Sequence, residues 1–232
     1  MFSRLVPALA FASVVIVAVP SAQAALIGTV PTVPGQTVVP GLVLGGTAPG
    51  TLLASLSAPF VSSLGTESGT AVSAVYRESG GMLDFYYQLT NNTTATNCGH
   101  AGQQACDPLS RLTATNFIGF LTSLGFRTDV FGPFVNGTVA PVTADRNSVG
   151  DVVGFSFNPP DSAKIQPGQT SFVLVISTDA TNFTTGNVSV IDGGVTTVAS
   201  FEPRSNPVPE PTSLLLVIGG LIGFAARRLR QP

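Results

Sequence analysis

Short segments in which apolar and polar side chains alternate constrain the fold of this chain most strongly. The clearest runs from Met82 to Leu89: one face carries Leu83, Phe85, Tyr87 and Leu89, and the other carries Asp84, Tyr86 and Gln88. Successive side chains of a strand point to opposite faces, so this period of two predicts a β-strand. The glycine-containing turn Glu78–Gly81 separates it from Ala71–Arg77, which predicts a β-hairpin.

The second half of the chain repeats this pattern. Asp151–Phe157 places Val153, Phe155 and Phe157 on one face. Ser171–Thr178 is nearly continuous in Phe, Val, Leu and Ile, as expected for a central strand. The turn Asp192–Gly194 separates the predicted strands Asn187–Ile191 and Val195–Phe201. These segments together predict an all-β chain with one β-sandwich-like domain.

Length and composition support one domain of this class. The chain has 232 residues, and about 180 remain once the two terminal segments described below are set aside, which suits a single core. Only 9% of the residues are charged, whereas the exposed faces of helices are normally rich in Glu and Lys. We expect the β-sandwich-like domain to span residues 51–205.

Two segments are less clear. Asn116–Leu124 also matches a helical stripe through Phe117, Phe120, Leu121 and Leu124, so a short helix is an alternative to a strand there. Residues 25–50 are rich in Pro, Val and Gly and lack charge, and their proline spacing resists both a helix and a central strand. We interpret residues 25–50 as an extended leader or an edge segment.

The N-terminus has the three parts of a secretory signal peptide. Arg4 supplies a positive charge, residues 5–19 are largely apolar, and residues 22–24 form an Ala-x-Ala triplet. This order predicts a signal peptide over residues 1–24 with cleavage between Ala24 and Ala25, and therefore an exported mature protein.

The C-terminal segment, residues 206–232, has the order of a short membrane anchor. After the proline-rich stretch, residues 214–226 contain no polar side chain, and they are followed by Arg227, Arg228 and Arg230. A helix of this length reaches roughly 20 Å, less than the roughly 30 Å of a bilayer core, so the predicted transmembrane helix 214–226 is a marginal anchor. By the positive-inside rule the arginines form a cytoplasmic tail and the domain stays outside.

The sequence Val208-Pro209-Glu210-Pro211 gives this tail a closer resemblance. Together with the short apolar helix and the terminal arginines, it resembles the PEP-CTERM sorting signal of Gram-negative bacteria. The resemblance implies recognition by an exosortase, a membrane processing enzyme that removes the tail and passes the protein to the cell surface or an exopolysaccharide matrix. It also implies a transient anchor in the inner membrane before processing, with the domain facing outward.

Three other interpretations of the tail remain open. A plain C-terminal anchor has the same apolar stretch and arginines but does not require Pro209-Glu210-Pro211. A GPI signal ends in its hydrophobic segment, so the arginines count against it. A buried core helix of this length is the third alternative, and its fully apolar surface and terminal arginines disfavour it.

The two cysteines, Cys98 and Cys106, lie in one predicted loop. In an oxidising compartment this pair favours a disulfide, and closing so short a loop contributes about 2.5 kcal/mol in the chain-entropy model. An alternative uses Cys98, His100 and Cys106 as metal ligands, but no fourth ligand stands at local spacing. Free thiols are the remaining alternative.

Catalytic residues are hard to assemble from this sequence. His100 is the only histidine and stands between the cysteines, which disfavours a histidine-based hydrolytic site. Asp145 and Asp151 are a candidate carboxylate pair, although solvated acids or a surface pairing of Asp145 with Arg146 explain them better. The oxygens of residues 179–182 match no complete calcium loop. We expect no enzyme, no catalytic residue, no metal and no cofactor.

Charge and aromatic content decide between the partner classes. Residues 25–206 hold eleven acidic and six basic residues, a net charge of −5, which argues against nucleic acid as a partner. The expected partners are an exosortase, the membrane and, as a candidate, an exopolysaccharide. A carbohydrate-binding module using Tyr76, Tyr86 and Tyr87 is the alternative function, and an extracellular hydrolase is a third.

Overall fold

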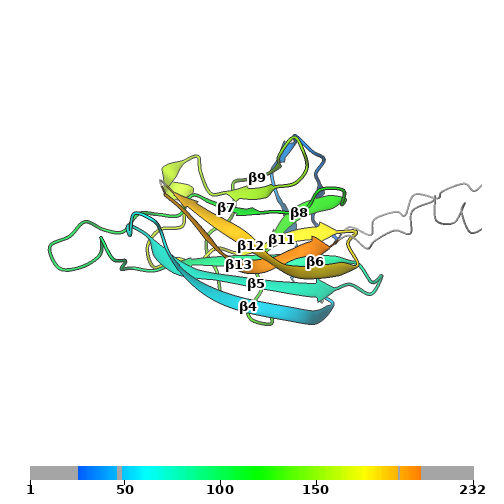
Figure 1. Ribbon diagram of the computed structural model, residues 1–232, viewed down its shortest axis with the longest axis horizontal. Helices are drawn as coiled ribbons and strands as arrows, with labels where there is room; N and C mark the ends of the chain where they lie inside the picture. The colour runs from blue at the N-terminus through cyan, green and yellow to red at the C-terminus, as the bar shows by residue number, and fades with distance from the viewer. Residues whose placement is uncertain (1–25, 46–48, 193, 205–232) are drawn as a thin grey trace, which may run out of the picture.

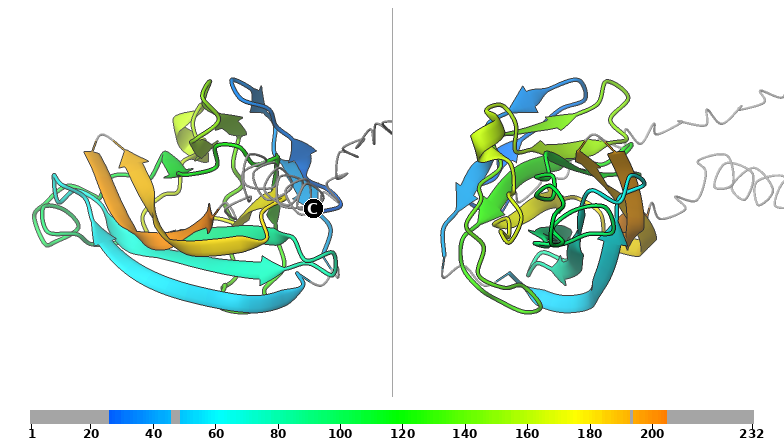
Figure 2. Two further views of the ribbon diagram at one scale, coloured as in Figure 1. Left: turned by 45° about the vertical axis from the view of Figure 1, so that its right-hand side comes forward. Right: turned by 90° about the vertical axis from the view of Figure 1, so that its left-hand side faces the viewer.

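The computed structural model describes residues 26–45, 49–192 and 194–204, and these residues form two β-sheets packed as a sandwich (Figures 1 and 2). We call the seven-stranded sheet, with strand order β1-β8-β11-β6-β5-β4 and β3 also paired to β8, sheet A. The six-stranded sheet, with strand order β13-β12-β7-β10-β9-β2, is sheet B. The predicted all-β class and β-sandwich architecture are confirmed.

The strands have the following bounds: β1 Val30–Pro31, β2 Thr37–Val38, β3 Gly41–Val43, β4 Thr51–Val61, β5 Ser68–Arg77, β6 Leu83–Asn91, β7 Arg111–Ala114, β8 Thr122–Arg127, β9 Thr143–Arg146, β10 Val153–Ser156, β11 Val173–Thr178, β12 Asn182–Asp192 and β13 Gly194–Arg204. A single 3₁₀ turn, η1, covers Asp161–Ala163.

The predicted hairpin is present as β5 and β6, which pair antiparallel from Gly69 and Asn91 to Arg77 and Leu83. The backbone of Glu78 closes the turn, because its N–H donates to the carbonyl of Met82. β11 is the predicted central strand and is hydrogen-bonded on both sides, to β6 and to β8. β12 and β13 form the last hairpin; the predicted turn between them includes residue 193, which lies outside the described residues.

The ambiguous segment after Asn116 is not a helix. Residues 116–121 form a turn-containing loop, and β8 begins at Thr122. Phe117 still enters the core, with no exposed surface, whereas Leu121 of the same apolar pattern is 49% exposed. The alternation of β8 then places Leu124 in the core and Ser123 on the opposite face.

The segment before residue 50 takes part in both sheets. β1 and β3 pair with β8 in sheet A, and β2 pairs with β9 in sheet B. Each of these strands has only two or three residues because prolines interrupt the ladder between them. The described sandwich therefore begins upstream of Thr51, and residues 30–43 form an edge segment that joins the two sheets.

The main core lies between the sheets. Its side chains come from both layers, including Phe85 and Tyr87 of β6, Leu112 of β7 and Phe155 of β10. At the opposite edge from β1 and β2, β13 packs against β4 and β5, and Tyr87 donates its hydroxyl to the carbonyl of Phe201 in β13 at 3.2 Å. The sandwich is thus closed on both sides by contacts between the layers.

A second apolar cluster covers the outer face of sheet A. Tyr76, Tyr86 and Val175 lie on this face, and Phe134 from the loop after β8 and Leu26 from the N-terminal segment pack over them. Sheet A is consequently buried on both faces along β5, β6 and β11. This second covering explains why polar side chains of the outer face, such as Asp84, are fully buried.

Candidate functional site

The residues predicted to direct sorting lie at the ends of the chain. The motif Val208–Pro211, the apolar segment 214–226 and the basic tail Arg227, Arg228 and Arg230 are outside the described residues, as is the cleavage position Ala24–Ala25. The described part of the chain contains no helix long and apolar enough to cross a membrane. What the structure does show is where these segments connect, namely after Arg204 of β13 and before Leu26.

The two cysteines form the predicted disulfide, with their Cα atoms 4.9 Å apart. Both are buried, whereas His100 between them is exposed. Because both sulfurs are bonded to each other, the alternative in which Cys98, His100 and Cys106 hold a metal ion is wrong for this structure. Within the described ranges, no group of three or more His, Cys, Asp and Glu side chains is placed to hold a metal.

The two candidate acids, Asp145 and Asp151, have separate partners. Asp145 is held by Arg111, whose Nη1 and Nη2 atoms donate to its two oxygens at 2.6 and 2.9 Å. Asp151 instead accepts the backbone N–H of Asn116 at 3.1 Å. Each carboxylate therefore has a structural role. Of the two explanations given above, solvated acids or a surface pairing of Asp145 with Arg146, the second is replaced by the pair with Arg111, because neighbouring residues of β9 point to opposite faces.

Arg146 has an unexpected position among backbone carbonyls. Its Nη2 atom donates to the carbonyls of Phe117, Phe120 and Gly150 at 2.7, 2.9 and 2.9 Å, and the side chain is buried. Burial lowers the pKa of its guanidinium, and the charge of Asp179 opposes that shift. Asp179 itself accepts the N–H of Leu121 at 2.8 Å, so it too orders the loop before β8.

The tyrosines do not form a surface platform. Tyr76, Tyr86 and Tyr87 expose 3% or less of their surface. Among the described residues, the large apolar side chains that are well exposed are all aliphatic: Ile27, Val33, Val39, Leu42, Leu44, Leu52, Leu53, Val61, Leu64, Ile118, Leu121, Val130, Val135, Val149 and Val195. The side chains on which the carbohydrate-binding alternative depended are therefore unavailable to a ligand.

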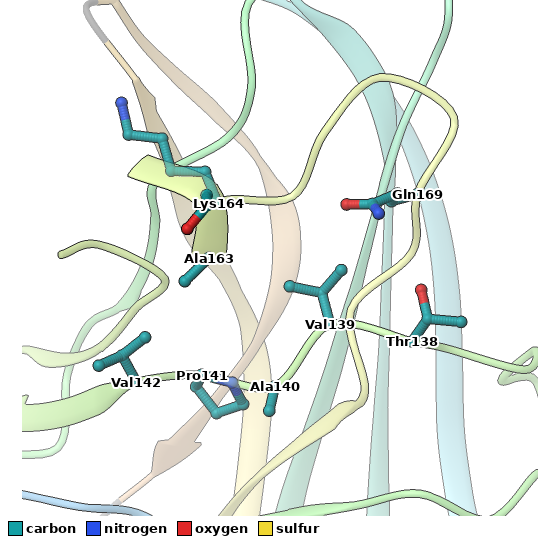
Figure 3. Close-up of a pocket in the computed structure, with 9 residues that line it drawn as sticks. Thr138, Val139, Ala140, Pro141, Val142, Ala163, Lys164 and Gln169 are labelled. Carbon is teal, nitrogen blue, oxygen red and sulfur yellow. The ribbon is translucent and has the colours of Figure 1, made fainter. Parts of the chain in front are cut away.

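An open surface cavity of about 420 Å³ lies between the segment before β9 and the η1 turn (Figure 3). Its lining is mixed: Val139, Ala140 and Pro141 are apolar, and Gln169 lies at one side. Lys164 is its charged member, and Figure 3 shows the ammonium directed away from Pro141. The ammonium lies 3.3 Å from carboxylate oxygens of both Asp161 and Asp192, so it already has partners.

A buried carboxyl group with a strongly raised pKa lies on the outer face of sheet A. Asp84 in β6 has no exposed surface, and burial, reinforced by the neighbouring carboxyl of Glu78, raises its pKa to about 8. The hydroxyls of Ser177 and Tyr86 oppose this shift. Asp84 Oδ1 and Glu78 Oε1 are both buried without a hydrogen-bond donor among the described residues.

An arginine is buried further along the same face. Arg127 of β8 is 1% exposed, donates from Nε and Nη2 to Asp129 at 3.0 and 2.8 Å, and lies 4.5 Å from the centre of the Phe131 ring. Burial raises the pKa of Tyr86, and Arg127 opposes that rise while Asp84 adds to it. Tyr86 thus stands between the cationic and the acidic parts of the face.

Sequence reasoning missed this buried polar face. Asp84, Tyr86 and Gln88 occupy the polar side of an alternating strand, which normally faces water. The only available signal was the size and aromatic character of Tyr86 at a position expected to be exposed. The residues that cover the face, Phe131 and Phe134, come from a loop whose sequence has no periodicity.

Comparison with known proteins identifies the C-terminal tail. Residues 207–231 match the family model described as the PEP-CTERM protein-sorting motif, which confirms the resemblance. The motif implies export, membrane-associated sorting and processing by an exosortase, and the disulfide is consistent with an extracytoplasmic location. No curated protein and no solved structure matches the chain.

Proposed function

We propose that this chain is a non-enzymatic component of the cell surface or of an exopolysaccharide matrix, delivered there when an exosortase removes its C-terminal tail. The observation that carries the proposal is the PEP-CTERM motif at residues 207–231, joined to a β-sandwich that is closed on both sides. The motif directs export and sorting, and the sandwich is the part of the chain that remains after the tail is removed.

The connection between sandwich and motif is short. β13 is an edge strand that ends at Arg204, and Val208 begins the motif sequence only four positions later. A chain extends at most about 3.6 Å per residue, so the motif starts within roughly 15 Å of the folded body. The sandwich therefore has to stand next to the membrane while the tail is processed.

The distribution of charged side chains supports a structural role. The acids that sequence analysis offered for chemistry are committed elsewhere, Asp145 to Arg111 and Asp151 to a backbone N–H. His100 is exposed within the disulfide-closed loop. Among the described residues, it forms no side-chain hydrogen bond with Asp145 or Asp151. This arrangement favours a scaffold over a hydrolase.

Mass spectrometry of the protein from cells with and without an active exosortase tests the route. We expect the chain from exosortase-containing cells to lack the apolar segment 214–226, and the chain from deficient cells to keep it. Glu210→Ala in the motif should preserve the tail in both strains. Ser205→Ala, outside the matched residues 207–231, is the matched control and should be processed normally. An intact C-terminus through Pro232 in exosortase-containing cells would overturn the proposal.

A further inference from the structure

A row of polar residues crosses the outer face of sheet A next to the N-terminal segment. Ser177 of β11 is paired in register with Ser123 of β8 on one side and with Asp84 of β6 on the other. Cross-strand neighbours on one face have Cβ atoms about 5 Å apart, so the three side chains form a continuous row. All three are buried, and Asp84 and Ser123 have no exposed surface at all.

Leu26 anchors the start of the described chain on this row. Its side chain is 6% exposed and packs in the apolar cluster with Tyr76 and Tyr86. Its backbone N–H donates to Ser177 Oγ at 3.5 Å. The nitrogen of Leu26 is therefore held above the hydroxyl that adjoins Asp84, at a fixed place in the fold.

The same place has more acceptor oxygens than donors. Tyr86 donates its hydroxyl to Asp84 Oδ2 at 3.4 Å, and the carboxyl groups of Asp84 and Glu78 lie within hydrogen-bonding reach of each other. Asp84 Oδ1, Glu78 Oε1 and Ser123 Oγ are buried without a hydrogen-bond partner in the described part of the chain. The nearby cation, Arg127, is held by Asp129 and lies over Phe131. Two carboxyl groups side by side in an apolar setting are costly to ionise without a compensating cation.

The geometry points to a binding site for a primary ammonium here, and we propose that its ligand is the chain's own mature N-terminus, the α-amino group of Ala25, which pairs with Asp84 and Glu78. The inference rests on the export route proposed above and on cleavage after Ala24. Adjacent backbone nitrogens are at most about 3.6 Å apart, so the new amino group is within reach of the polar row.

Cleavage changes the chemistry of that nitrogen. In the precursor, the nitrogen of residue 25 belongs to an uncharged peptide bond, and the hydrolysis of the Ala24–Ala25 bond by water releases it as an amine that takes up a proton at neutral pH. An ammonium has three donors, which matches the acceptor oxygens left unpaired on Asp84, Glu78 and Ser123. Removal of the signal peptide would thus supply the missing hydrogen-bond donors on the outer face of sheet A.

The chain offers a direct probe, because Lys164 is its only lysine. The exported mature protein then has two primary amines, the α-amino group of Ala25 and Lys164 Nζ. Trace labelling with isotope-coded acetic anhydride at pH 7.5, followed by peptide mass spectrometry, measures both rates in one sample. We expect Ala25 to be labelled at least tenfold more slowly in the folded protein than in urea.

Substitutions separate an ion pair from simple burial. Asp84→Asn should bring the labelling rate of Ala25 to within about threefold of the rate in urea and leave Lys164 unchanged. Asp192→Asn is the matched control: it removes a carboxylate from Lys164 and should accelerate labelling of Lys164 alone. If Asp84→Asn does not fold, Glu78→Gln is the second variant and should accelerate labelling of Ala25 at least threefold.

Two results would overturn the inference. One is a labelling rate of Ala25 that stays at the wild-type value in the folded Asp84→Asn and Glu78→Gln variants. The other is an N-terminal peptide of the exported protein that begins at a residue other than Ala25. Neither result depends on the C-terminal mass, which tests exosortase processing separately.

Discussion

The guanidinium of Arg111 lies over the backbone of Gly154, and a β-carbon added at Gly154 would overlap Arg111 Nη2. Arg111 in β7 and Asp145 in β9 flank β10, and their ion pair crosses the outer face of sheet B at this glycine. The glycine is needed for space, because its backbone is not in the left-handed region.

Gly154→Ala should therefore destabilise the protein by about 1–2 kcal/mol, because the added methyl displaces Arg111 from Asp145 and Ser156. The free energy of unfolding in urea measures this loss. In an Arg111→Ala background the same substitution should cost less than about 0.5 kcal/mol, since the space is then free. An equal cost in both backgrounds would show that the ion pair is not what Gly154 accommodates.

Arg146 gives a second prediction. Arg146→Met leaves the carbonyls of Phe117, Phe120 and Gly150 without their donor, and the expected loss is about 3 kcal/mol in the free energy of unfolding. Arg146→Lys should recover only part of it, because an ammonium cannot reproduce the planar fork.

Arg77→Met is the control for Arg146, since the Arg77 side chain makes an exposed hydrogen bond to Thr181 at 3.5 Å; we expect a change below about 0.5 kcal/mol. Urea unfolding of the three variants measures these changes in the free energy of unfolding. A loss for Arg146→Met as small as that for Arg77→Met would contradict the assigned role.

The strands that could be predicted are those whose alternation extends over several residues. β6 and β11 are long enough for period and apolar content to identify them. The Glu78 turn also fixes the pairing of β6 with β5 locally, whereas the partners of β11, β6 and β8, lie far away in the sequence. β1, β2 and β3 could not be predicted as strands of the sandwich, because two or three residues show no period. Their pairing depends on β8 and β9, which lie far along the chain.

The buried polar face could not be predicted for a different reason. Whether Asp84 faces water or protein depends on the second layer formed by Phe131, Phe134 and Leu26, not on β6 itself. The sorting motif is the opposite case. It is a linear sequence pattern, so Pro209-Glu210-Pro211 could be identified without any knowledge of the fold.

The disulfide gives a third prediction. Cys98 and Cys106 are eight positions apart, and closing so short a loop stabilises the native state by about 2.5 kcal/mol. A variant with both cysteines replaced by serine should lose about that much in urea unfolding. Reductant should lower the stability of the wild-type protein by a similar amount and leave the double variant, which has no cysteine, unchanged. An equal loss in the double variant would show that the reductant does not act through the Cys98–Cys106 bond.

The raised pKa of Asp84 gives a fourth prediction, which is clearest in protein whose Ala25 amino group is acetylated. The folded state holds the proton of Asp84 up to a pKa of about 8, whereas an unfolded Asp releases it near pH 4. The stabilisation is therefore complete below about pH 4 and is lost as the pH rises through about 8. The steepest loss is about 1.4 kcal/mol per pH unit.

Urea unfolding of the acetylated protein between pH 4.5 and 8.5 measures this slope. The pKa of Asp84 is shifted by Glu78, Ser177 and Tyr86, and the pKa of Tyr86 is in turn shifted by Arg127. The substitution Asp84→Asn removes none of these four side chains. This variant should nearly abolish the slope, because an amide does not titrate in the range. Asp107→Asn, at an exposed position, should keep it. A stability that rises over this range, or a slope that survives in Asp84→Asn, would mean that the buried proton is not on Asp84.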